Sequence, residues 1–179
     1  MSTLALPERY TFEPTPHVPN SPLPVLIYRA ALLLEGDHPN DETDDSFRQP
    51  SPSSVRDLIE RNGWIQGGVF KTFWSHHFHS VTHECYAVFK GESKLLLGRG
   101  PLDDAETYRG TEVVVRCGDV IVLPGSPKYD NNFCKAGPDE TIEKALACSD
   151  VPVPESDPVF GLGGPLVGIW KDALASAKT

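Results

Sequence analysis

Positive charge is scarce in this sequence. Its 16 lysines and arginines stand against 25 aspartates and glutamates, which gives a net charge of −9 at pH 7. Proteins that bind nucleic acid present a basic face to the phosphates, and anionic membrane surfaces attract basic segments for the same reason. The charge balance therefore argues against nucleic acid and against membranes as partners.

Long apolar runs are missing too. The sequence has no apolar stretch of the ~18 residues that a membrane-spanning helix requires, and residues 1–9 lack the apolar core of a secretory signal. The cysteines are Cys85, Cys117, Cys134 and Cys148, which form no Cys-x-x-Cys pair. We expect a cytoplasmic protein with reduced thiols, or else a disulfide between two of these cysteines.

Proline and glycine, by contrast, are abundant, with 17 and 15 among 179 residues. They favour short strands and turns over long helices, and the length suits one domain. Within it we expect an extended proline-rich arm over residues 1–24. A strand, an acidic loop and a helix packed on the main body follow over residues 25–68, and a β-rich body with a C-terminal helix over residues 69–179.

Short apolar segments separated by turn residues indicate the strands. They are expected at residues 25–28, 69–79, 84–89, 94–97, 112–117 and 120–123. Ser53 or Ser54 can cap a short helix that ends at Asn62-Gly63, and residues 166–178 carry the apolar stripe of a terminal helix. Strands at this spacing predict a mainly β fold, an antiparallel sandwich or small barrel.

Histidines cluster in one short segment. His76, His77, His79, His83 and Glu84 lie within nine residues. Alternate residues of a strand share a face, so His77 and His79 point the same way, and a turn can return Glu84 beside them. Two imidazoles and a carboxylate suit Fe, Mn, Ni, Co or Zn as the divalent ion and leave positions open for other ligands. His76 is expected to face outward.

The spacing resembles the first motif of the cupin superfamily, G-x5-H-x-H-x3,4-E-x6-G. His77, His79, Glu84 and Gly91 occupy its positions from the first histidine onward, whereas Lys71 stands where the motif begins with glycine. The resemblance implies an RmlC-like jelly-roll barrel with a metal inside, held by three histidines and one glutamate. Carried over residue by residue, it assigns His77, His79 and Glu84 as metal ligands.

The second cupin motif, G-x5-P-x-G-x2-H-x3-N, is matched only at its start, from Gly118 to Pro124. Ser126 replaces its second glycine and Tyr129 its histidine. A phenol has a pKa of about 10 and is a poor neutral ligand. Tyr129 is therefore expected to be an acid or a hydrogen-bond donor, with a surface aromatic as the alternative.

One cupin subgroup is more similar still. Residues 19–28, 62–64, 77–84 and 157–166 resemble segments of the YjlB-type cupins, which are small single-domain proteins. The resemblance extends over about residues 10–170, nearly the whole chain. It implies a cupin-type antiparallel sandwich or jelly-roll barrel, with the arm, the short helix and the C-terminal helix outside.

The neighbours of Glu84 divide between the two faces of its strand. Tyr86 and Val88 share its face and would line the site, while Cys85 points away and is expected to be a packed thiol. His83 also points away on a regular strand, so we expect His83 to be a turn residue or a hydrogen-bond donor that orients a metal ligand. If the chain bulges there, His83 could become the missing ligand.

Three functions fit these residues. The first is a metal-dependent enzyme that oxidises, decarboxylates or isomerises a small organic molecule, with Tyr129 and His83 as candidate catalytic residues. The second is a metal-free isomerase or epimerase, as the resemblance to sugar-epimerase cupins allows, with His79 as base and Tyr129 as acid. The third is a non-catalytic cupin that keeps a relic site.

A homodimer is also expected. The predicted strand over residues 69–79 is apolar on both faces, with Phe70, Trp74 and Phe78 opposite the histidines. Three aromatic side chains on one face require a cover. A second subunit can supply it, and the proline-rich arm or the helix is the alternative.

Overall fold

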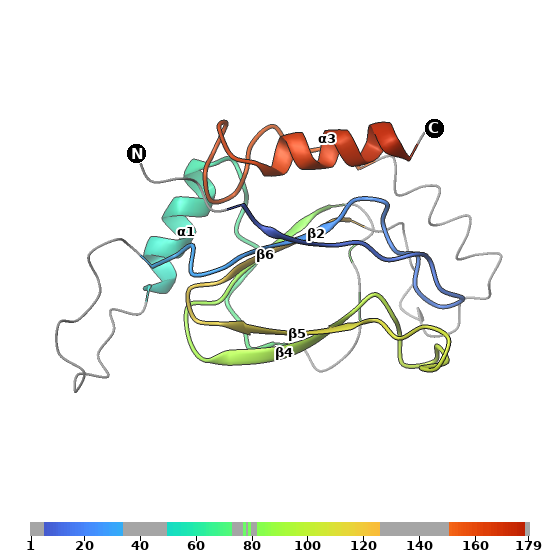
Figure 1. The fold of residues 1–179 in the computed structure, drawn as a ribbon. Coiled ribbons are helices and arrows are strands. Elements are labelled where there is room, and N and C mark those ends of the chain that lie inside the picture. The colour runs from blue at the N-terminus through green and yellow to red at the C-terminus, as the bar shows by residue number, and fades with distance from the viewer. Residues whose placement is uncertain are drawn as a thin grey trace.

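The structure is a computed structural model that describes residues 6–33, 50–72, 77, 79, 82–125 and 151–177. Its strands form two antiparallel sheets (Figure 1). The larger sheet has the order β1-β2-β6-β3, and the smaller pairs β4 with β5. The strands are β1 (Glu8–Tyr10), β2 (Val25–Tyr28), β3 (Glu84–Ala87), β4 (Glu92–Leu97), β5 (Thr111–Arg116) and β6 (Val120–Leu123).

The four-stranded sheet is the middle of three layers. The β4-β5 pair covers one face, and the C-terminal helix α3 (Leu166–Ser176) covers the other (Figure 1). Strand β2 is buried on both faces because its side chains alternate between these layers. Val25 and Ile27 pack toward the smaller sheet, whereas Leu26 and Tyr28 pack against α3.

Helix α1 (Pro52–Arg61) confirms the predicted short helix but begins earlier than expected. Ser51 is the N-cap, and its hydroxyl accepts a hydrogen bond of 3.1 Å from the Ser54 backbone N–H. Pro52 is compatible with the first turn because that position needs no intrahelical N–H donor. The helix ends at Arg61 with Asn62 as its C-cap, so it stops at the predicted Asn62-Gly63 pair, where Gly63 has φ of 83°.

A buried aspartate fixes α3 to the sheet. Asp157 is fully buried and accepts a 2.5 Å hydrogen bond from the Tyr28 hydroxyl on β2. Its carboxylate also accepts from three backbone N–H groups, those of Val159, Phe160 and Leu166. The start of α3 is therefore held against β2 by one side chain.

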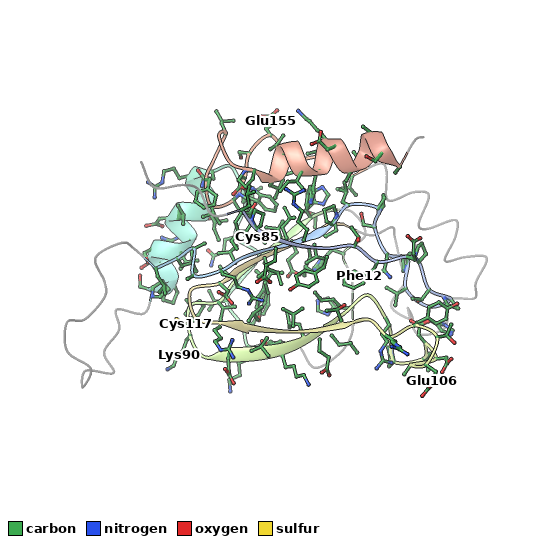
Figure 2. The ribbon with its side chains drawn as sticks, in the orientation of Figure 1. Phe12, Cys85, Lys90, Glu106, Cys117 and Glu155 are labelled. Carbon is green, nitrogen blue, oxygen red and sulfur yellow. The ribbon has the colours of Figure 1, made fainter. Side chains whose placement is uncertain are left out.

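The N-terminal arm binds along the sandwich. Phe12 lies between the two sheets (Figure 2) and covers Gly98, where a Cβ atom would come within 2.2 Å of the ring. Asn20 donates to the Gly98 carbonyl at 2.8 Å, and Thr15 donates to the buried Asp103 carboxylate at 2.7 Å. The short edge strand β1 was not predicted, and the arm turns between Thr15 and Val18, where the Thr15 N–H donates to the Val18 carbonyl at 2.9 Å.

The predicted fold class, a mainly β antiparallel sandwich with a short helix and a C-terminal helix, is confirmed. In the described part of the chain the two sheets do not close into a barrel. The predicted strand over residues 69–79 is wrong for residues 69–72, which form no strand, and most of its remainder lies outside the described residues. No described helix is long and apolar enough to cross a membrane. The division at residues 24 and 68 stays a prediction.

Candidate metal centre

Strand β3 positions the carboxylate of the candidate site. Glu84 is its first residue and pairs with Leu123 of β6. Tyr86, two residues on, packs in the core between the sheets, so Glu84 points to that same side. The Glu84 side chain is 20% exposed, which leaves the carboxylate partly accessible to solvent.

Two histidines approach this carboxylate. His79 Nε2 lies 3.3 Å from Glu84 Oε2. The rings of His77 and His79 meet edge to face, with centroids 5.5 Å apart and an interplanar angle of 76°. Potential ligand atoms of His77, His79 and Glu84 all lie within 4.8 Å of one another. The structure thus brings together the three residues that the spacing selected.

The contact between His79 and Glu84 suits two ligands of one ion. His79 Nε2 is buried, and no described group makes a well-formed hydrogen bond with it. At metal–ligand distances of about 2.0–2.2 Å, two ligand atoms on a tetrahedral or octahedral ion lie roughly 3–3.5 Å apart. The observed 3.3 Å falls in this range. The His77-His79-Glu84 group could therefore hold a metal ion.

Electrostatics couple the two partners when no metal is bound. The Glu84 carboxylate raises the pKa of His79, and burial of the ring offsets this only in part. A protonated His79 forms an ion pair with Glu84, so a proton and a metal compete for the same nitrogen.

His83 lies on the opposite face of the sheet. Its Nδ1 accepts a 2.8 Å hydrogen bond from the Gly125 N–H, and its Nε2 lies 3.1 Å from the Pro152 carbonyl. The ring packs on Trp170 of α3, with centroids 4.5 Å apart. Burial lowers the pKa of His83, which favours the neutral ring. Because Nδ1 accepts from Gly125, the ring proton is on Nε2.

Both ring nitrogens of His83 are thus engaged with backbone. These contacts tie the end of β6 to the chain at Pro152 and give His83 a positioning role that the sequence did not reveal. Their partners lie 42 and 69 residues away, which no local pattern can indicate. A catalytic role for His83 stays a prediction.

Cys85 lies on the same side as His83, toward α3 (Figure 2). Burial raises the pKa of its thiol, with smaller contributions from Asp157 and Glu84. A thiol that stays protonated is a poor nucleophile. Cys85 and Cys117 are both free, whereas Tyr129, His76, Cys134 and Cys148 lie outside the described residues.

Tyr86, which was expected to line the site, belongs to a cluster of three hydroxyls whose other members the sequence did not indicate. Thr72 Oγ1 lies 3.1 Å from the Tyr86 hydroxyl and 2.5 Å from Ser93 Oγ on β4. Phe70 packs on the Tyr86 ring with centroids 6.2 Å apart. On a regular strand over residues 69–79, Thr72 would lie on the face opposite His77 and His79. Because residues 69–72 form no strand, alternation gave no signal for this cluster.

Comparison with known proteins gives one informative relative. The chain is 27% identical over 178 residues to a Bacillus subtilis (strain 168) protein named YjlB and described as uncharacterized, covering 91% of this chain and 96% of the relative. No family model matches the sequence. No solved structure matches it either. The similarity to a YjlB protein is therefore supported along nearly the whole chain, although that name does not itself specify a cupin.

Proposed function

We propose that this chain is a cupin that binds one divalent metal ion through His77, His79 and Glu84, and that the site acts on a small organic molecule. The observation that carries the proposal is the convergence of three ligand atoms within 4.8 Å, with the buried His79 Nε2 lacking a well-formed hydrogen bond to any described group. Compatible ions are Fe, Mn, Ni, Co and Zn.

Three ligands from one side leave coordination positions for the substrate. A bound divalent ion would supply Lewis-acid polarisation of a substrate oxygen, or oxygen activation if it is iron. Glu84 offsets part of the ion's charge, and His79 must be neutral at Nε2 to serve as a ligand. His77 is exposed, which provides an approach from solvent. Oxidation, decarboxylation and isomerisation are all compatible with such a site.

The test is a calorimetric titration of the chelator-treated protein with Mn and Zn. Glu84→Gln and His79→Ala should abolish binding or weaken it greatly, because each removes a ligand. Glu92→Gln is the matched control, since Glu92 is an exposed carboxylate on β4 paired with Arg116 at 3.4 Å. Equal metal affinities in Glu84→Gln and Glu92→Gln would rule out the proposed triad.

The second candidate is metal-free acid–base catalysis by His79 and Tyr129. The ion pair of His79 with Glu84 favours it, because a histidine with a raised pKa can hold a proton for transfer. A diphosphate-sugar substrate is disfavoured, because its phosphates would need arginines in the site, and Arg116 of β5 is exposed and pairs with Glu92. Activity that persists in metal-free protein and disappears in Tyr129→Phe would support this candidate.

We also propose that the chain forms a homodimer through the segment that follows α1. Ile65, Val69 and Phe70 expose 92%, 57% and 46% of their surface. Apolar side chains gathered in six residues are typical of an interaction surface. A compact monomer in solution scattering would contradict the dimer.

A further inference from the structure

The hydroxyls of Tyr86, Thr72 and Ser93 form a chain across the interior of the sandwich. Tyr86 projects from β3 into the core between the sheets, and Ser93 lies on β4 in register with the buried Val115 of β5. Thr72 Oγ1 joins them, at 3.1 Å from the Tyr86 hydroxyl and 2.5 Å from Ser93 Oγ. The cluster thus links three segments that are distant in sequence.

This hydroxyl chain has more O–H donors than it has hydrogen bonds between its members. Each of the three groups carries one O–H, while only two contacts join them. Whichever way the protons are arranged, one O–H is left to donate outside the chain. That O–H can donate to an acceptor oxygen, such as an oxygen of a carboxylate.

One member of the hydroxyl chain shares a strand face with a candidate metal ligand. Tyr86 follows Glu84 by two residues on the same strand face, so their Cα atoms are about 6.6 Å apart. With neutral imidazoles, one glutamate and a divalent ion, the site would carry a net charge of about +1. This charge favours an anionic ligand, even though the protein as a whole has a net charge of −9.

We propose that Tyr86, Thr72 and Ser93 are the second anchor of the substrate. Resting on the proposed metal site, this inference assigns the substrate class as a small organic acid with a second oxygen-bearing group. One group binds at the metal, and the other accepts the hydrogen bond that the hydroxyl chain leaves free. Tyr86 is then a specificity-determining residue, and Thr72 positions its hydroxyl.

The test compares two probe anions on the Zn-loaded protein by calorimetry. Acetate has one carboxylate and engages the metal alone, whereas succinate can extend its second carboxylate to the hydroxyl chain. Tyr86→Phe and Thr72→Val should weaken succinate binding by about tenfold or more and leave acetate binding unchanged. Tyr10→Phe is the matched control, because the Tyr10 hydroxyl bonds Glu8 at 2.8 Å, away from the cluster.

The outcomes separate the two proposals. If the variants bind Zn normally and bind succinate as tightly as the wild type, the hydroxyl anchor is wrong and the metal site stands. If the wild type fails to bind Zn, both proposals fall. If the hydroxyl chain has only a structural role, the variants will have lower melting temperatures, and they will bind acetate and succinate either both unchanged or both weaker by the same factor. Ser93→Ala provides the same comparison if one of the other variants does not fold.

Discussion

Replacing Asp157 by asparagine should destabilise the protein severely. Asp157 Oδ2 accepts from the Tyr28 hydroxyl at 2.5 Å and from the Leu166 N–H at 3.1 Å, in a fully buried position. In Asp157→Asn, Oδ1 can still accept from Val159 and Phe160, but an amide NH₂ at the place of Oδ2 can accept from neither the Tyr28 hydroxyl nor the Leu166 N–H. Losing two hydrogen bonds to a charged acceptor, each worth about 1.5–3 kcal/mol, costs about 3–6 kcal/mol.

That loss is large against the total stability of a domain, which is about 5–15 kcal/mol. With a urea m-value of about 2 kcal/mol/M, the unfolding midpoint should fall by about 1.5–3 M. Tyr28→Phe removes one of the two donors and should cost about half as much. Asp172→Asn, on the exposed side of α3, is the matched control and should leave the midpoint unchanged.

Urea unfolding followed by tryptophan fluorescence measures these shifts, since Trp170 of α3 is fully buried. The Tyr28→Phe/Asp157→Asn double variant should be about as stable as Asp157→Asn alone, because the Tyr28 hydroxyl has already lost its charged acceptor in Asp157→Asn. A midpoint for Asp157→Asn within experimental error of the wild type would refute the role given to Asp157.

Three further predictions concern the site and its surroundings. Without metal, the wild type should be more stable than Glu84→Gln below pH ~6.5, the unfolded pKa of histidine. This advantage should be lost as pH rises through the raised pKa of His79. Thermal unfolding of both proteins across pH measures it, and a difference in melting temperature that does not change with pH would contradict it. Metal binding should instead tighten as pH rises, because His79 must lose its proton, which calorimetry in buffers of different ionisation enthalpy reports. His83→Ala should have a lower melting temperature than His83→Asn, because the amide oxygen of asparagine can still accept from the Gly125 N–H. Equal melting temperatures would exclude the positioning role of His83.

The parts of the fold that the sequence predicted are those with local signals. Residues 25–28 and 120–123 are apolar tetrapeptides bounded by turn residues, and both strands lie where expected. Residues 69–72 begin with two strand-favouring apolar residues, Val69 and Phe70, but form no strand, because a strand also needs a ladder partner, which local sequence does not specify. Strand β1 forms because β2 pairs with it. Its three residues follow Pro7 and are too few for a recognisable strand pattern, so the sequence did not predict it.

The same distinction applies to the candidate site. Alternation and spacing were enough to select His77, His79 and Glu84, since all three lie within eight residues. The position of His83 depends on Gly125, Pro152 and Trp170, which only the tertiary fold brings to it. Likewise, the hydroxyl chain joins Thr72 to Ser93, 21 residues away, through an irregular segment that was expected to be a strand.

The most direct test of the central claim is the metal content of the native protein. Elemental analysis of wild-type protein purified without chelators should find about one divalent ion per chain, and His77→Ala purified in parallel should have lost most of it. Less than about a tenth of an equivalent in the wild type, with no rise in melting temperature on adding Fe, Mn, Ni, Co or Zn, would contradict a metal site at His77, His79 and Glu84.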